Sequence, residues 1–100
     1  PEQVRVLPLG DDMVPYADEV LAAAKKAGLR ASVDASSEKL GAKIRKAELE
    51  KVPHMFVVGR KEAEGGLVSL RSRLRKNFEG ERSVEEAVRL VSDDAKNRVL

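Results

Sequence analysis

Short stretches in which apolar and polar residues alternate recur along the chain and predict β-strands. Residues 3–7 and 29–33 show this alternation and are expected to form half-buried strands. Residues 54–58 are apolar on both faces after the first position, which is typical of a central strand covered on both sides. A glycine pair then predicts a turn into an antiparallel strand over residues 67–71, and one further short strand fits within residues 72–80.

Between these strands the apolar positions recur every three or four residues, which is the period of an amphipathic helix. The first helix follows Asp11 or Asp12, either of which can cap its N-terminus, and the second covers residues 38–51. The last helix begins with a capping box, in which the Ser83 hydroxyl and the Glu86 carboxylate each accept a backbone amide. The chain is therefore expected to hold three helices.

The alternation of strands and helices predicts parallel strands joined by right-handed crossovers. The hairpin expected after residue 58 adds an antiparallel strand, so the sheet is mixed but mostly parallel. We therefore expect a three-layer α/β/α fold, with a sheet of four to five strands and three helices, in a single domain over residues 1–100.

Composition narrows the classes of protein further. Of the 100 residues, 42% are hydrophobic and 36% are charged, which is the balance of a folded globular domain rather than a disordered chain. The absence of cysteine excludes disulfides and thiolate chemistry, and a single histidine disfavours a zinc site. No apolar run approaches the roughly 20 residues of a membrane span, and the first residues lack a signal-peptide pattern.

A search for catalytic groups finds little. His54 opens the predicted central strand and is expected to be a partly buried structural residue. The stretch "PLGDD" after the first strand has one glycine and two acidic residues, which would repel a phosphate group. Because Asp11 and Asp12 are sufficiently explained by helix capping, the sequence disfavours a catalytic domain.

The placement of basic residues is more informative than the net charge of only +2. Lys39, Lys43 and Lys46 share one face of the second predicted helix with Glu50. A solvent-exposed face is the simplest interpretation, and contact with phosphates is the alternative. Arg45 lies on a different stripe of the helix and carries a planar group of donors that suits bases and phosphates.

A second basic cluster is "RSRLRK", residues 71–76. In an extended chain Arg71, Arg73 and Arg75 point to the same side, and three arginines exceed what is needed to protect an edge strand from aggregation. Glu62 lies near them if the hairpin forms. Arginines beside a carboxylate can contact the bases and phosphates of a single-stranded RNA loop. Aromatic residues, which single-strand binders use for stacking, make up only 3% of the chain.

At these residues the chain resembles a known family. The stretches "PEQVRVLPLGDD", "GLRASVD", "EKLGAKIRKAELEKVPHMFVVGRKE" and "GGLVSLRSR" are similar to the C-terminal anticodon-binding domain of class II aminoacyl-tRNA synthetases, most closely that of threonyl-tRNA synthetases. The resemblance covers residues 1–73 well and the last helix loosely. It implies the class II anticodon-binding domain fold and recognition of the anticodon loop of a threonine tRNA.

The resemblance also implies which residues contact the anticodon. Glu62 is placed against the anticodon, Arg71 contacts an anticodon base, and Arg45 reaches in from the second helix. Ser37 stands where the family usually has asparagine, so the expected contact there has one hydroxyl donor instead of an amide. His54 replaces a family tyrosine.

Three further residues are expected to contact phosphates at most. They are Lys39 and Lys43 of the lysine face, and Arg73 of the arginine cluster. The segment after Arg73 is longer and more charged than is usual in the family, so no family contact is transferred to it.

For the whole enzyme of the family, the resemblance implies a threonine–tRNA ligase, a homodimer whose separate catalytic domain uses ATP, magnesium and zinc. This chain is then the non-catalytic domain, which needs no cofactor, is monomeric when isolated, and belongs to a cytoplasmic or an organellar enzyme. Two alternatives stay open: an accessory or protein-interaction module that kept the fold without the RNA, and a small-molecule-binding α/β domain. Salt-dependent tRNA binding distinguishes the first interpretation from both.

Overall fold

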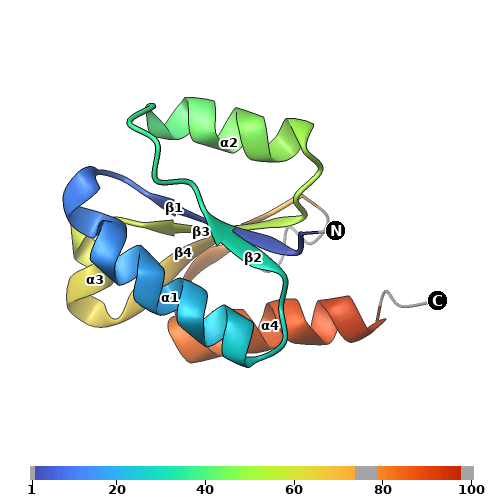
Figure 1. Cartoon of the computed structure of the whole chain (residues 1–100). Helices are drawn as coiled ribbons and strands as arrows, with labels where there is room; N and C mark the ends of the chain where they lie inside the picture. Colours follow the sequence, from blue (N-terminus) through green and yellow to red (C-terminus); the bar gives the residue numbers. More distant parts are fainter. Residues whose placement is uncertain (1, 74–78, 98–100) are drawn as a thin grey trace.

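The chain forms a three-layer α/β/α sandwich, shown in Figure 1 from a computed structural model that describes residues 2–73 and 79–97. One five-stranded sheet lies in the middle, with strand order β2-β1-β3-β4-β5. Its elements are β1 (Val4–Pro8), a 3₁₀ turn (Asp11–Met13), α1 (Val14–Lys26), β2 (Ala31–Val33), α2 (Leu40–Leu49), β3 (His54–Val58), α3 (Arg60–Gly65), β4 (Leu67–Ser72), β5 (Gly80–Ser83) and α4 (Val84–Asn97). The expected fold class is confirmed, but the further short strand, expected within residues 72–80, is β5 and begins only at Gly80.

The sheet is mixed, as the pattern predicted. Strand β1 pairs in parallel with both β2 and β3, whereas β4 runs antiparallel to β3 and to β5. The two edges are short: β2 has three residues and β5 has four. The central position of β3, with all five residues buried, agrees with its apolar sequence.

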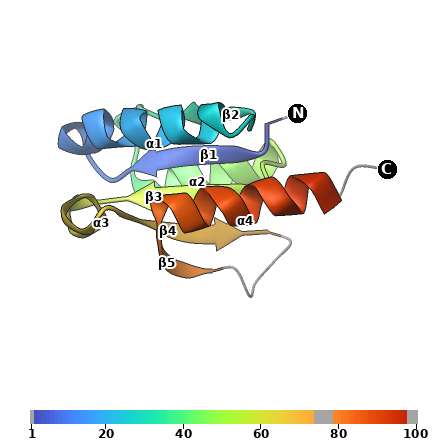
Figure 2. The same ribbon diagram turned by 90° about the horizontal axis from the view of Figure 1, so that it is seen from below.

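Two hydrophobic cores lie on the two faces of the sheet. Helices α1 and α4 lie side by side on one face, as Figure 2 shows, and cover the larger core. Its buried residues include Val4, Val6, Val20, Phe56, Val58, Val68, Leu70 and Val91. Helix α2 covers the smaller core on the other face, formed by Leu7, Ala47, Val52, Met55 and Val57.

Helix α2 does not cover the whole of its face. In β4 the residues that face α1 and α4 are buried, but the alternate residues become more exposed along the strand, and Arg71 is exposed. Since Arg71 pairs with Met55, which belongs to the core under α2, Arg71 lies on the α2 side of the sheet. A strip of sheet beside α2 is therefore open.

A short helix replaces the expected hairpin tip between β3 and β4. Gly59 precedes α3, its amide donates to Glu62 Oε1 at 2.8 Å, and Gly66 follows in a left-handed conformation with φ of 68°. A side chain at Gly59 would place its Cβ 2.5 Å from Leu9 Cδ1, so the exposed side chain of Leu9 would have to move. The fold therefore has one helix more than the three expected.

The predicted helix caps are only partly formed. Asp11 and Asp12 lie in the 3₁₀ turn and neither side chain caps α1, so that expectation is wrong. The Ser83 hydroxyl accepts the amide of Glu86 at 3.1 Å, as expected, but the Glu86 carboxylate binds Arg82 at 3.0 Å. Among the described residues, no helix is long and apolar enough to cross a membrane.

The position of β3 predicts a sharp contrast between two acidic substitutions. Val57→Asp places a carboxylate on a site that is 7% exposed, and should lower the free energy of unfolding by about 3 kcal/mol or more. Leu49→Asp makes the same change on a side chain that is 77% exposed, and should cost about 1 kcal/mol or less. Urea denaturation of both variants checks this, and equal losses would contradict the assignment of β3 to the core.

Candidate nucleic-acid interface

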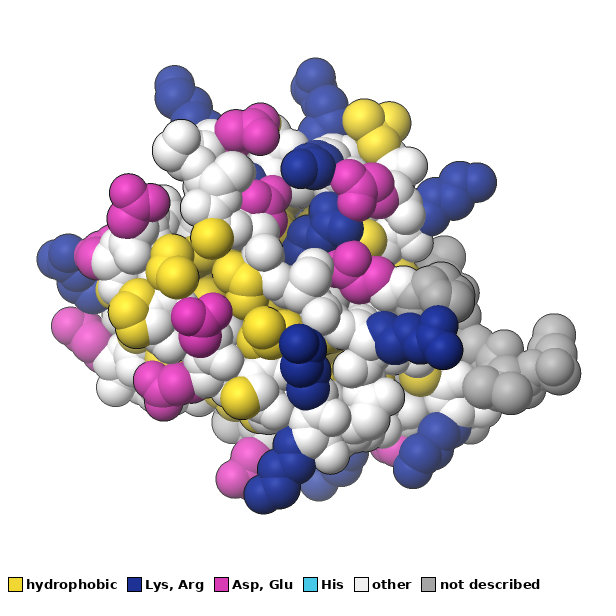
Figure 3. All heavy atoms as spheres, in the orientation of Figure 1, with side chains coloured by type: hydrophobic (Ala, Val, Ile, Leu, Met, Phe, Trp, Pro, Cys, Tyr) yellow, Lys and Arg dark blue, Asp and Glu magenta, His cyan; other side chains and the backbone are white. Residues whose placement is uncertain are grey.

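Helix α2 presents basic side chains to solvent. Figure 3 shows Lys and Arg side chains projecting over α2 in the upper part of the view. Lys39 precedes the first turn, and Arg45 and Lys46 are exposed along the helix. These three residues line a broad, shallow hollow of about 710 Å³ together with Leu49. This surface can attract an anion, because its cations are exposed and not engaged in the core.

Lys43 does not belong to this surface. Its side chain is 3% exposed, and Nζ donates to the carbonyl oxygen of Pro8 at 2.9 Å. The reason is its position on the helix, three residues after Leu40 and four before Ala47, on the face that packs on the sheet. The expectation that Lys43 is exposed is therefore wrong, and it cannot contact a phosphate while it binds Pro8.

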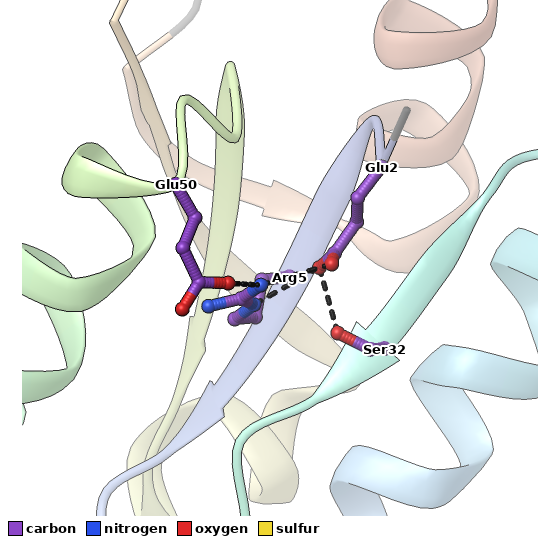
Figure 4. Close-up of polar contacts among 4 residues, drawn as sticks. All are labelled: Glu2, Arg5, Ser32 and Glu50. Carbon is purple, nitrogen blue, oxygen red and sulfur yellow. Dashed lines mark hydrogen bonds and ion pairs between the residues drawn. The ribbon is translucent and has the colours of Figure 1, made fainter.

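A buried arginine holds the other end of α2. Figure 4 shows Arg5 of β1 between Glu2 and Glu50. Its Nη2 lies 2.9 Å from Glu2 Oε1 and 2.6 Å from Glu50 Oε1, its Nε donates to Glu2 Oε2 at 3.0 Å, and Ser32 Oγ donates to the same oxygen at 2.6 Å. Because Glu50 caps the C-terminus of α2, the cluster joins β1, β2 and α2.

The interactions within this cluster keep both Glu2 and Arg5 in their charged forms. Burial by itself would raise the pKa of Glu2, but hydrogen bonds from Arg5 and Ser32 hold it below its ordinary value. The hydrogen bonds to Glu2 also raise the pKa of Arg5 further, so it stays charged although its side chain is only 9% exposed. The sequence did not indicate this role, because residues three positions apart in a strand point to opposite sides of the sheet, and Glu2 meets Arg5 only because it precedes β1.

The loop from β2 to α2 carries Ser37. Before it, the amide of Ser36 donates to Asp34 Oδ1 at 3.1 Å and forms a tight turn. Burial would raise the pKa of Asp34, but the hydrogen bonds with Ser36 and the charges of Lys43 and Lys46 lower it. Ser37 itself is exposed at the N-terminal end of α2, close in the chain to Lys39.

Arg71 and Arg73 are exposed on either side of the buried Ser72, as an extended chain predicts. The amide of Arg73 donates to the carbonyl oxygen of Pro53 at 2.9 Å. This bond holds Arg73 beside the first residue of β3. Arg75, the third member of the predicted cluster, lies outside the described residues. Two arginines are thus held on the open strip beside α2.

Glu62 lies at the other end of β4. It is half-buried in α3, where one carboxylate oxygen accepts the amide of Gly59. Arg71 lies four positions along β4 from Leu67, which is at the α3 end of the strand. Four positions correspond to a length of about 13 Å. The expectation that Glu62 lies beside the arginines is therefore wrong, because α3 occupies the turn and Arg71 is near the far end of the strand.

His54 is more deeply buried than expected. It is 1% exposed, and its Nε2 lies 2.9 Å from Asp94 Oδ2, so it connects β3 to α4. This structural role agrees with the interpretation of the sequence. Among the described residues, no three His, Asp or Glu side chains lie close enough together to hold a metal ion.

Comparisons with known proteins agree with one another. The family model described as "Anticodon binding domain" matches residues 3–94. The chain is 44% identical over 100 residues to a threonine–tRNA ligase of Chloroherpeton thalassium, and 46% identical over 98 residues to that of Chlorobaculum tepidum. The two matches include 100% and 98% of this chain, but the chain spans only 15% of the length of each relative.

Two solved structures share the fold. The RNA-binding domain of threonyl-tRNA synthetase from Cryptosporidium parvum matches with a TM-score of 0.86 and 28% identity, over 93% of this chain and 23% of that chain. Histidyl-tRNA synthetase from a Nostoc species matches with a TM-score of 0.86 and 21% identity, over 95% of this chain and 23% of that chain. The second match, at this low identity, is evidence for the fold alone.

The Arg5 cluster predicts a stability that depends on pH. Arg5→Met leaves two carboxylates without their cation and should lower the free energy of unfolding at pH 7 by about 2–3 kcal/mol. Since the folded-state pKa of Glu2 is lowered, its contribution is present above the unfolded-state value and is lost as the pH falls through the folded-state value. The difference between wild type and Arg5→Met should therefore shrink as the pH falls below about 4.5.

The matched control is Arg60→Met, which removes an arginine from the exposed pair with Asp12. That variant should change stability by about 0.5 kcal/mol or less. Denaturant melts of the three proteins from pH 3 to 8 make the measurement. An Arg5→Met deficit that is constant over this range would contradict the role given to Glu2.

Proposed function

The chain belongs to the family of anticodon-binding domains, and from that premise we propose that it recognises the anticodon loop of a threonine tRNA. In this proposal it is the RNA-binding part of a threonine–tRNA ligase. The observation that carries the proposal is the open strip of sheet beside α2, where Arg71 and Arg73 are exposed next to the basic surface of the helix.

The strip has the chemistry for reading a base. Arginine can donate two parallel hydrogen bonds to the acceptors of one base, and each good bidentate contact discriminates by about 1–3 kcal/mol. Arg71 projects from β4, where it pairs with Met55 of β3, so its position is held before the RNA binds. We assign the base contact to Arg71, and phosphate contacts to Arg73 and Lys39.

The remaining residues extend the site along the sheet. Ser37 and Glu62 are placed at the carboxyl ends of β2 and β3, whereas Arg71 lies where β3 begins. Because about 13 Å of β4 separates its α3 end from Arg71, we assign Glu62 and Arg71 to different nucleotides. We therefore propose that an unstacked RNA loop lies along the strip, with Arg45 of α2 beside it.

Aromatic stacking has a small part in this proposal. Phe56 is fully buried in the core, and the Tyr16 hydroxyl donates to the carbonyl oxygen of Leu67 at 2.7 Å. The affinity would then depend on arginine and on phosphate contacts, which makes it sensitive to salt. Weak binding by the isolated chain is expected, because a longer ligase adds further contacts.

The chain spans 15% of the ligases that it resembles, so the reaction itself is assigned to another part of such a protein. There we place the activation of threonine with ATP and magnesium, the zinc site and the homodimer interface. The cytoplasm is the proposed location. The domain contributes by holding the anticodon so that the other end of the tRNA reaches a remote active site.

The decisive test compares two RNA stem–loops that differ only in the anticodon bases, one of them with a threonine anticodon. Arg71→Ala should weaken binding to the threonine stem–loop by about tenfold, and weaken the altered one less. Lys39→Ala, the matched loss of an exposed charge, should weaken both equally and lower the salt slope by about 1. Titrations at several salt concentrations measure both effects.

Equal losses for both RNAs in Arg71→Ala would show that Arg71 is only an electrostatic contact. Absence of salt-dependent binding by the wild-type chain would overturn the RNA function. It would favour an accessory module that shares only the fold.

Glu62→Gln separates the helix cap from a base contact. Glutamine keeps an oxygen that can accept the amide of Gly59, so the melting temperature should change by about 2 °C or less. It loses the charge that accepts hydrogen bonds from base amines, so binding to the threonine stem–loop should weaken by about threefold or more. Unchanged affinity with a lowered melting temperature would assign Glu62 to the cap alone.

A further inference from the structure

One edge of the sheet, formed by strand ends rather than by an outer strand, gathers residues from four strands. Val4 of β1 pairs with both Ala31 of β2 and His54 of β3, and His54 also pairs with Ser72 of β4. The three parallel strands therefore begin at the edge where the antiparallel β4 ends. Arg30, Lys51 and Arg73 lie at this edge, just outside the strands, and we call them the basic edge.

A cavity of about 390 Å³ opens at the basic edge. Arg30 and Lys51 line it together with Pro53, whose carbonyl oxygen accepts the amide of Arg73. Arg30, Lys51 and Arg73 are all exposed. Two of these cations, Arg30 and Lys51, therefore line the cavity, and Arg73 lies beside it through its hydrogen bond to Pro53. The lining also includes Glu2, His54 and Asp94.

The carboxylates of this edge are already engaged within the protein. They are Glu2 and Glu50, which bind Arg5, Asp94, which binds His54, and Glu79, which accepts the amide of Ser72. By contrast, Arg30 and Lys51 form no ion pair with any residue in the described part of the chain. The charged groups of Arg30 and Lys51 are therefore available to an external anion.

Lys51 is held in an unfavourable backbone conformation. Its φ is 61°, in the left-handed region, at the position after the α2 C-cap where glycine is usual. The amide of Val52 donates to Ala47 at 3.0 Å and that of Lys51 to Glu48 at 3.0 Å, so the helix ending imposes this conformation. A lysine at a position that glycine would satisfy better points to a use for its side chain.

We propose that the basic edge binds the phosphodiester backbone of the tRNA beside the anticodon. The proposal rests on the function proposed above, because Arg73 lies two residues from the base-contacting Arg71. From β4 to β2 the edge spans three strand spacings, about 14 Å. This length exceeds the size of one phosphate group, so successive phosphates of one RNA strand can lie along it. A run of phosphates, rather than one isolated anion, therefore fits the edge.

The test uses Lys51→Gly, Arg30→Ala and, as control, Arg89→Ala. Arg89 is exposed on α4 but is not one of the residues that line the cavity, and its loss changes the net charge equally. Lys51→Gly should raise the melting temperature by about 4 °C, because glycine adopts the left-handed conformation without strain. The same variant should bind both stem–loops about three- to tenfold more weakly and lower the salt slope by about 1.

Arg30→Ala should show the same loss of affinity for both RNAs, without discrimination between the anticodons, whereas Arg89→Ala should match wild type within about twofold. If Lys51→Gly and Arg30→Ala bind like Arg89→Ala, the phosphate site is overturned and a protein contact becomes the better explanation of this edge. That result leaves the base contact of Arg71 standing. A wild-type chain that binds neither stem–loop overturns the proposed function and the phosphate site together.

Discussion

The position of α2 over the sheet depends on one buried cation. Arg5 binds Glu2, which precedes its strand, and Glu50 at the end of the helix, while Ser32 of β2 donates a hydrogen bond to Glu2. A buried ion pair adds less stability than its Coulomb energy suggests, because both charges lose water, but it tolerates little change in geometry. Lys43, which binds Pro8, attaches the other end of α2 to β1. The open strip on β4 has a defined width because α2 is held at both ends.

Charge in this chain is therefore divided between two uses. Arg5 and Lys43 are buried and engaged, and they belong to the architecture. Arg45, Lys46, Arg71 and Arg73 are exposed, and they give the surface its basic character. The net charge of +2 conceals this division, because many acidic residues neutralise the structural cations or lie in helix termini. Counting charges would underestimate the capacity of one face to bind an anion.

Most of the fold could be predicted from the periodicity of the sequence, because the burial of one face leaves a regular pattern of apolar residues in the strands and in the long helices. The apolar run of β3 and the stripe of α4 are clear examples. Helix α3 could not be predicted because six residues are too few to show a period, and Gly59 is as compatible with a turn as with a helix start. Lys43 was misplaced because periodicity assigns every lysine to solvent, although a lysine side chain can cross a core and reach a carbonyl oxygen. The distance between Glu62 and Arg71 was also outside the reach of pattern analysis, because it depends on the length of β4.

The short edges of the sheet have a consequence for how the domain can be carried on a longer chain. Strand β2 offers only three residues on one side, and β5 offers four on the other, with Glu81 and Arg82 among them. Unpaired strand edges are templates for intermolecular β-pairing, and brevity and charge both oppose this. The domain can therefore be concentrated beside copies of itself, as in an oligomeric enzyme, without the sheets joining into a continuous aggregate.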